Sequence, residues 1–85
     1  MNQAILFNDD AHYSAEQKML RFSAIVSGST VTCIIEMGSF TKSQAMDPLS
    51  YFDKFKFDYE DLAEQLIEAE RFNDQGQIII TTQFF

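Results

Sequence analysis

The stretch from Leu20 to Met37, LRFSAIVSGSTVTCIIEM, constrains the fold of this chain more than any other. Two runs rich in β-branched and aromatic residues flank Gly28-Ser29, and glycine at the first central position suits a two-residue type II′ turn. We therefore expect a β-hairpin in which Ser27 faces Thr30. The pairs on one face of this hairpin are then all apolar: Val26–Val31, Ala24–Cys33, Phe22–Ile35 and Leu20–Met37.

The opposite face of the predicted hairpin is mixed in character. Its pairs are Ile25–Thr32, Ser23–Ile34 and Arg21–Glu36. The last of these is an opposite-charge pair, worth ~0.2–1 kcal/mol across strands. A solvent-facing antiparallel sheet is normally polar on its outer side, so Ile25 and Ile34 predict a cover for this face. The candidates are residues 11–18, the Phe84-Phe85 tail, or a second copy of the chain, and we expect a homodimer through the face or an edge of the sheet.

The N-terminal part of the chain offers one strand and one ambiguous segment. Gln3 to Phe7 is a short apolar run that ends at Asn8-Asp9-Asp10, which is typical of a strand followed by a turn. In the segment 11–18, Ser14 and Gln17 fit the two ends of a capping box. This segment is either one helical turn or an ordered loop.

Three helix-start signals follow the hairpin. Phe40 to Met46 is a short helix candidate with Ser39 as its N-cap. Asp47-Pro48 is a favoured opening, because proline at the first helical position has no N–H to leave unpaired, and helical periodicity continues to Lys56.

The third start signal predicts a longer helix. Asp58 can cap it, with Phe57 and Leu62 as a hydrophobic staple, and it would run to about Phe72. The two later helices could instead be one helix bent near Lys56, but the staple favours a break.

The end of the chain completes the predicted architecture. Gln77 to Phe85, QIIITTQFF, has no helical period and reads as the last strand. The order strand, hairpin, helices, strand predicts an α+β fold, in which two to three helices pack on one face of an antiparallel sheet. The length of 85 residues predicts one domain spanning residues 1–85.

Composition and charge disfavour several classes of function. The net charge of −7, from 13 acidic and 6 basic residues, disfavours binding to nucleic acid and to anionic membranes. It is compatible with a basic protein partner. The sequence shows no secretory signal and no long apolar run, so we expect no membrane association and a cytoplasmic location.

The motifs taken together resemble a known bacterial family, domain-of-unknown-function family 1488. The resemblance rests on Arg21-Phe22, Val26-x-Gly28, Val31-x-Cys33-x-Ile35, a Phe52-rich helix, a helix with Leu62, Leu66 and Ile67, and a closing Gly76-x-Ile78 strand. It covers nearly the whole chain and departs from the family pattern at Glu36-Met37-Gly38-Ser39. The resemblance implies a compact α+β domain and a bacterial cytoplasmic setting. It implies no activity and no catalytic residue.

Two residues deserve consideration as chemical groups. Cys33 lies on the inner face of the predicted hairpin, and we expect a buried thiol in the core, because no base or cation is placed beside it. A cysteine-based zinc site lacks ligands. His12 follows Asp9-Asp10, but this cluster has no second histidine, and Asp-rich turns are common without metals. We therefore predict no catalytic residue, no metal and no cofactor.

The longer predicted helix carries nearly all of the net charge. Between Asp58 and Asp74 seven acidic residues and one basic residue give a net −6. Glu60, Glu64 and Glu68 follow one another at a spacing of four, so they share one stripe of the helix. The stripe is either a solvated face or a docking surface for a basic partner. Aromatic residues interleave with charges over residues 51–59, and core packing explains them better than nucleic-acid stacking.

Two hypotheses about function follow, and the sequence favours the first, because no nucleophile–base pair, metal-ligand set or phosphate-binding loop supports catalysis. The first is a non-enzymatic interaction or oligomerisation module that acts through Ile25 and Ile34 on the sheet or through Glu60, Glu64 and Glu68 on the helix. The second is a small-molecule-binding protein or enzyme with a pocket between the aromatic helix and the sheet.

Overall fold

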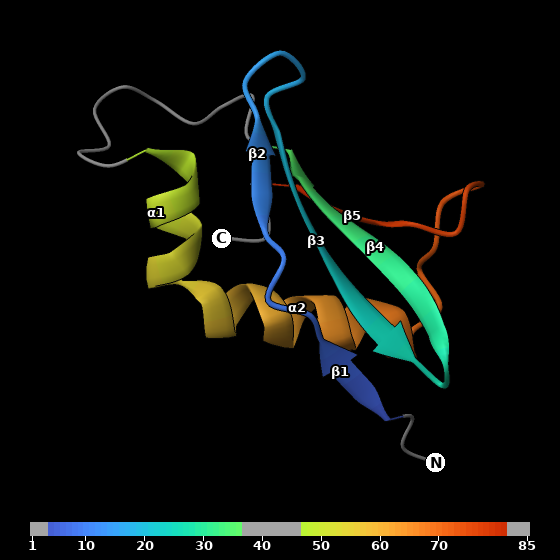
Figure 1. Ribbon diagram of the computed structural model, residues 1–85. Helices are drawn as coiled ribbons and strands as arrows, with labels where there is room; N and C mark the ends of the chain where they lie inside the picture. Colours follow the sequence, from blue (N-terminus) through green and yellow to red (C-terminus); the bar gives the residue numbers. More distant parts are fainter. Residues whose placement is uncertain (1–3, 37–46, 82–85) are drawn as a thin grey trace.

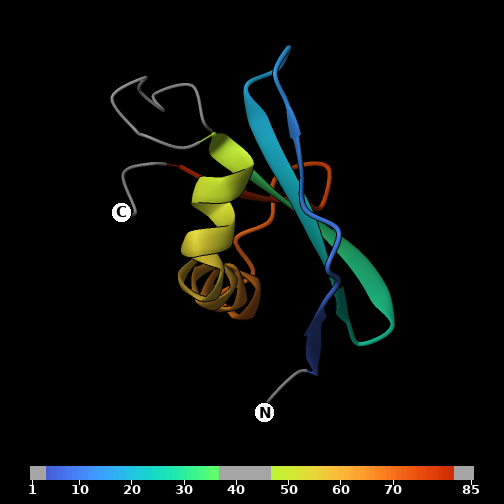
Figure 2. The same ribbon diagram turned by 60° about the vertical axis from the view of Figure 1, so that its left-hand side comes forward.

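An α+β fold is formed by five strands and two helices in the computed structural model, which describes residues 4–36 and 47–81 (Figure 1). The elements in chain order are β1 (Ile5–Phe7), β2 (His12–Ser14), β3 (Met19–Val26), β4 (Ser29–Glu36), α1 (Pro48–Lys54), α2 (Lys56–Glu68) and β5 (Ile78–Ile80). Both helices lie on the same face of the sheet (Figure 2). The predicted fold class is therefore confirmed, while the helix expected over residues 40–46 lies outside the described residues.

The sheet is mixed, in contrast to the antiparallel sheet expected from the sequence. Its order is β1-β3-β4-β5, and β2 also pairs with β3. The pairs among β1 to β4 are antiparallel, but β5 runs parallel to β4, with Ile34 opposite Ile79. The chain leaves β4 and crosses over through α1 and α2 before it enters β5, and such a crossover suits parallel neighbours. The run of three isoleucines fits a strand buried on both faces.

The β3–β4 hairpin forms with a register two residues from the predicted one. Its loop is Ser27-Gly28, with φ of 51° and 84°, and positive φ at both positions is the signature of a type I′ turn. Val26 accordingly faces Ser29, and the expected Arg21–Glu36 pair does not form, because Arg21 faces Ile34. A shift of two residues leaves every side chain on its predicted face, since side chains alternate with a period of two.

The core lies between the inner face of the sheet and the helices. Buried side chains from both layers form this core, among them Leu20, Phe22, Ala24, Cys33, Ile35, Phe52, Tyr59, Ala63, Ile67, Ile78 and Ile80. A chain of aromatic contacts links the layers, with ring centroids 5.2 Å apart for Phe22 and Phe52 and 5.4 Å apart for Phe52 and Tyr59. The aromatic residues of the helical segment thus contribute to the core, as predicted, although Phe57 is 82% exposed.

The first helix begins as the sequence predicts. The Asp47 carboxylate caps α1 by accepting a hydrogen bond from the Ser50 backbone N–H at 2.8 Å, and Pro48 occupies the first helical position. The two helices are separate, with a break at Phe55, where φ is −111°.

The second helix differs from the prediction at both ends. Phe55 is its N-cap, so α2 starts two residues before Asp58, and the exposed Phe57 makes no hydrophobic staple. The helix ends at Glu68 rather than near Phe72. Glu70 then adopts a left-handed φ of 57°, and Phe72 forms an isolated bridge with Ile78.

The ambiguous segment 11–18 contains a strand and a tight turn. Residues 12–14 form β2, and a four-residue turn leads back into β3. The Ser14 hydroxyl accepts a hydrogen bond from the Gln17 N–H at 3.3 Å, which is the contact that the capping-box pattern predicts, made here in a turn instead of a helix. No helix in the described part of the chain is long and apolar enough to cross a membrane.

Candidate functional site

The junction between β1 and β2 is a bulge that interrupts one edge of β3. Phe7 faces Ala24 and His12 faces Arg21, so the four residues from Asn8 to Ala11 lie opposite only two residues of β3. Extra residues on one strand disrupt the ladder locally and redirect side chains. The sequence predicted a turn at this point, because asparagine and aspartate favour turns.

On the outer face, the side chain of Asp10 replaces a missing hydrogen-bond acceptor of the interrupted β-ladder. Its carboxylate accepts a hydrogen bond from the Ser23 backbone N–H at 3.0 Å and a second one from the Ser23 hydroxyl. Asn8 completes this group, since its side-chain amide donates to the Ser23 hydroxyl at 2.9 Å. The backbone donor of Ser23, a residue that is only 9% exposed, therefore has a charged acceptor in place of a carbonyl.

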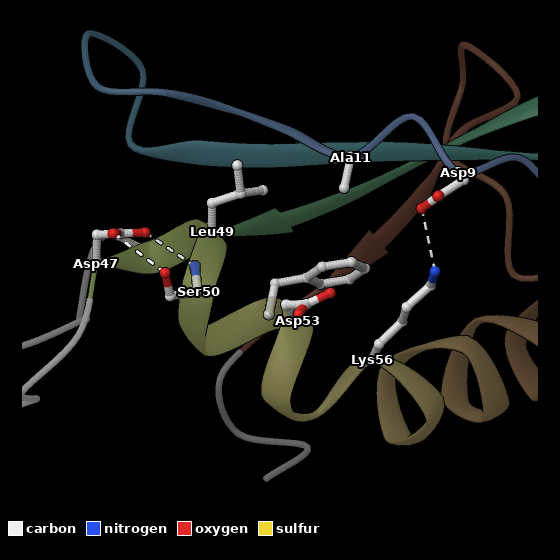
Figure 3. A pocket seen from close by; sticks show the side chains of 8 residues that line it. Asp9, Ala11, Asp47, Leu49, Ser50, Asp53 and Lys56 are labelled. Atoms are coloured by element: carbon white, nitrogen blue, oxygen red, sulfur yellow. Dashed lines mark hydrogen bonds and ion pairs between the residues drawn. The ribbon is translucent and has the colours of Figure 1, made fainter.

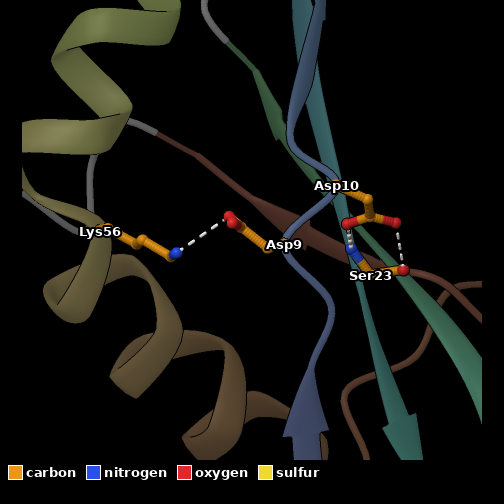
Figure 4. Close-up of polar contacts among 4 residues, drawn as sticks. All are labelled: Asp9, Asp10, Ser23 and Lys56. Carbon is orange, nitrogen blue, oxygen red and sulfur yellow. Dashed lines mark hydrogen bonds and ion pairs between the residues drawn. The ribbon is translucent and has the colours of Figure 1, made fainter.

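Asp9 points to the opposite side of the bulge, toward the helices (Figure 4). Its carboxylate lies 3.1 Å from the Lys56 ammonium at the start of α2. This contact raises the pKa of Lys56, and the charges of Glu60 and Asp53 act in the same direction. Because the Asp9 side chain is 94% exposed, the ion pair positions Lys56 without contributing much to stability.

An open groove of about 470 Å³ lies between α1 and the bulge (Figure 3). Its walls combine apolar side chains with three carboxylates, one hydroxyl and one ammonium: Ala11, Leu49, Phe52, Asp9, Asp47, Asp53, Ser50 and Lys56. Asp47 is committed to Ser50, whose backbone N–H lowers the pKa of the Asp47 carboxyl below its usual value. The groove therefore offers an apolar strip bordered mainly by negative charge.

The glutamate stripe of α2 continues from this groove. Lys56, Glu60, Glu64 and Glu68 follow one another at a spacing of four, so they lie along one side of the helix. Glu60 is half-buried, whereas Glu64 and Glu68 are exposed. Within residues 4–36 and 47–81, none of the three glutamates forms an ion pair. We call the carboxylates of Asp9, Asp47, Asp53, Glu60, Glu64 and Glu68 the acidic surface.

On the outer face of the sheet, Ile25 and Ile34, which the sequence analysis grouped as one contact surface, lie in different surroundings. Ile34 is only 4% exposed, and its neighbours on this face are Arg21 on β3 and Ile79 on β5. Ile25 is 37% exposed, and its register partner Leu6 on β1 is 65% exposed. The sequence did not indicate Leu6, because the run from Gln3 to Phe7 was too short to assign its faces.

The chemical groups considered from the sequence are not assembled into a reactive centre in the described residues. Cys33 is fully buried, as predicted, and this burial, with a smaller effect from the charge of Asp10, raises the pKa of its thiol to about 12. His12 is exposed, and its ring nitrogen Nδ1 lies 3.3 Å from the backbone oxygen of Asp10. Asp9 and Asp10 diverge, and no three His, Cys, Asp or Glu residues of the described ranges gather as metal ligands would.

The groove residues were missed as a group by the sequence analysis. Asp9 was assigned to a turn, Asp53 and Lys56 were read as charges between core aromatics, and Asp47 was identified only as a helix cap. One sequence signal could have indicated the groove. Aromatic and charged residues alternate after Pro48, so apolar and charged side chains occupy adjacent positions of α1.

The fold and the groove define a small α+β protein with a mixed sheet and both described helices on one face. Comparison with known proteins identifies its family: the model described as "Protein of unknown function (DUF1488)" matches residues 5–80, and the chain belongs to this family. The resemblance noted from the sequence is thereby confirmed.

Relatives and a solved structure agree with this assignment. The chain is similar to the uncharacterized protein YrdB of Escherichia coli (strain K12), with 35% identity over 82 residues that cover 92% of this chain and 96% of YrdB. It is 34% identical to YrdB of Shigella flexneri over the same length. It also resembles the crystal structure of a DUF1488 family protein of unknown function from Shewanella loihica PV-4, with a TM-score of 0.79, 32% identity and coverage of 94% of both chains.

Proposed function

We propose that this protein is a non-enzymatic interaction module that binds a basic segment of a protein partner on its acidic surface. The observation that carries the proposal is the continuity of this surface, which runs from the three groove aspartates to the glutamate stripe of α2 with Lys56 between them. Complementary charge attracts a partner from a distance and fixes its orientation on contact.

The distribution of charge supports docking rather than simple solubility. The segment from Asp58 to Asp74 has a net charge of −6 of the total of −7, so most of the excess negative charge lies on and just after α2, the helix that carries Glu60, Glu64 and Glu68. Phe57 adds a large apolar side chain that is 82% exposed beside Lys56. Exposed aromatic residues next to charges are typical anchors of protein interfaces.

The openness of the groove favours a protein segment over a small molecule. Ligand pockets usually enclose most of the surface of the bound compound. Here the carboxylate of Asp9 at the groove is 94% exposed, and the polar side chains at its two ends belong to different elements of the fold. A long ligand can contact both ends at once, whereas a compact one would leave most of the groove open.

Fluorescence anisotropy with a basic peptide of sequence TRTRT, which carries a fluorophore at its N-terminus and an amide at its C-terminus, tests the proposal. We expect saturable binding at low salt, which weakens steeply as the ionic strength rises toward 0.5 M. Glu64→Lys should weaken binding by about tenfold, and Asp74→Lys is the matched control, because it makes the same charge change outside the acidic surface. An equal loss of affinity in both variants would show that only the net charge of the protein matters, which would contradict a defined docking surface.

Self-association is a second candidate, supported by the exposed apolar side chains of Leu6 and Ile25, which are register partners on β1 and β3. These two register partners are both exposed, and neighbouring exposed apolar side chains are typical of contact surfaces. Sedimentation equilibrium on the wild type and on Leu6→Lys would decide it. A dimer that dissociates in the variant supports the candidate, and a monomeric wild type at high micromolar concentration contradicts it.

A further inference from the structure

The edge of β2 is open to a further strand. β2 pairs with β3 alone among the described strands, and its other edge carries no partner within those residues. An unpaired edge presents a row of backbone donors and acceptors to any extended chain that approaches it.

The register shows which backbone groups face this open edge. Asn8 donates to the Ser23 carbonyl at 2.9 Å and Ser27 donates to the Ala4 carbonyl, so the odd-numbered residues of β3 point their backbone groups toward β1 and β2. Arg21 therefore bonds with His12, and the next pair, Leu20 with Tyr13, is a non-hydrogen-bonded pair of this ladder. The N–H and C=O of Tyr13 point away from β3, toward the open edge.

The groove lies along the same edge. Helix α1 packs against β2, and Ala11, directly before β2, lines the groove across from Leu49 on α1 (Figure 3). A strand added beside Tyr13 would point every second side chain toward the helices, on the face where the groove lies. The bulge at Asp9 and Asp10 limits this addition to the β2 half of the edge.

The groove selects the kind of side chain that would enter. Its apolar strip suits the aliphatic stem of arginine or lysine, and the carboxylates at its border suit the cationic end. Asp53 is exposed on α1 and has no hydrogen bond or ion pair within the described residues, so its carboxylate is available to such a group.

We infer that the partner's contact segment is an extended basic peptide that adds as a strand to the open edge of β2 and places alternate arginine or lysine side chains in the groove beside α1. This inference rests on the proposed function, and it specifies how the basic segment is recognised. Main-chain hydrogen bonds to Tyr13 supply the pairing, while the groove supplies the preference for basic side chains.

The experiment compares acetyl-TRTRT-amide with two N-methylated forms of the same peptide. In an antiparallel addition, the arginine opposite Tyr13 donates its N–H to the Tyr13 carbonyl and accepts the Tyr13 N–H with its own carbonyl. Methylation of the two arginine backbone nitrogens removes this donor and therefore blocks binding. In a parallel addition the bonds go to the flanking residues, so methylation of the third and fifth amides blocks it. Each form carries two methyl groups and the same charge, which makes each the control of the other.

We expect one methylated form to lose at least about tenfold in affinity while the other stays within about threefold of the parent peptide. The hydrogen exchange of the Tyr13 amide should also slow by at least about tenfold when the parent peptide is bound. In the protein, Asp53→Lys should weaken binding about tenfold, and Asp74→Lys, with the same charge change, should have less than a threefold effect.

Three results would overturn the inference. If both methylated peptides bind as well as the parent and Tyr13 exchange is unchanged, the segment docks by charge alone, and the proposed function survives without strand addition. If agmatine, a small guanidinium compound, binds as tightly as the peptide, the groove is a small-molecule site. If the parent peptide does not bind at 1 mM in low salt, about the weakest affinity of interest, both the inference and the proposed function fail.

Discussion

The Asp10 carboxylate accepts a hydrogen bond from the backbone N–H of Ser23, in the place that a carbonyl would take in an uninterrupted strand. This contact has a consequence on the other side of the bulge. Because Asp10 is held on the outer face, the preceding Asp9 points toward the helices and reaches Lys56 (Figure 4). The bulge thus gives its two aspartates different roles: Asp10 completes the hydrogen bonding of the sheet, and Asp9 contributes to the shape and charge of the groove.

Two neighbouring aspartates should therefore differ strongly when each is replaced. Asp10→Ala leaves the backbone N–H and hydroxyl of the largely buried Ser23 without their acceptor, and we expect a loss of about 1–3 kcal/mol in the free energy of unfolding. Asp9→Ala removes one exposed ion pair and should change it by less than about 0.5 kcal/mol. Urea denaturation at neutral pH measures both, and equal losses would contradict the assigned roles.

The helix caps give a second matched pair. Asp47 accepts the Ser50 N–H and caps α1, so Asp47→Ala should cost about 1 kcal/mol, within a range of about 0.5–2. Asp58 lies inside the first turn of α2 and makes no cap contact, so Asp58→Ala should cost only a few tenths of a kcal/mol through the helix dipole. Thermal unfolding followed by circular dichroism separates these effects. A larger loss for Asp58→Ala would place the start of α2 where the sequence suggested it.

The hairpin loop predicts a stabilising substitution. Ser27 has a φ of 51°, which asparagine tolerates better than serine, and Asn-Gly is the preferred pair for a type I′ turn. Ser27→Asn should raise the free energy of unfolding by several tenths of a kcal/mol. Ser29→Asn, at the first residue of β4, is the control and should bring no gain. A gain at Ser29 alone would support a Gly28-Ser29 loop.

These corrections show where the sequence was sufficient and where it was not. The faces of β3 and β4 were predicted correctly from alternation, but alternation cannot distinguish registers that differ by two residues. The loop could be Ser27-Gly28 or Gly28-Ser29, and the choice depended on whether Ser27 adopts a positive φ. The identity of a serine does not predict this. The parallel direction of β5 was also hidden, since three consecutive isoleucines fit either direction.

The candidate site was predicted less completely than the fold. The glutamate stripe of α2 followed from spacing alone, because helical periodicity depends only on local sequence. The groove depends on the bulge, which brings Asp9 near Lys56 from 47 residues away along the chain. No local pattern encodes this contact. The exposure of Leu6 and the burial of Ile34 were likewise set by which strands flank them.

The buried thiol of Cys33 predicts a pH dependence of stability. Its pKa is about 12 in the folded state against an ordinary value of 9.0, so the unfolded chain loses this proton first as the pH rises. The contribution to stability is complete below pH 9 and declines between pH 9 and 12, by up to about 1.4 kcal/mol per pH unit. Tyr59, also raised to about 12, adds a decline that starts near its ordinary value of 10.0.

Cys33→Ala isolates the thiol from the other groups that titrate in alkali. The variant lacks the decline that begins near pH 9, so the difference in unfolding free energy between wild type and variant should shrink as the pH rises. Urea denaturation at pH 8, 9.5 and 10.5 measures this difference. A difference that stays constant over this range would show that the thiol is not desolvated in the folded state.

The most direct test of the acidic surface as a docking site is a map of backbone amide shifts. The ¹⁵N-labelled protein is titrated with acetyl-TRTRT-amide at low salt and its ¹H–¹⁵N spectrum is followed. We predict that the largest shifts cluster at residues 9–13, in α1 and along the Glu60–Glu64–Glu68 stripe of α2, and that they vanish at high salt. Largest shifts at the β3–β4 turn or on the outer face around Ile25 would contradict the account.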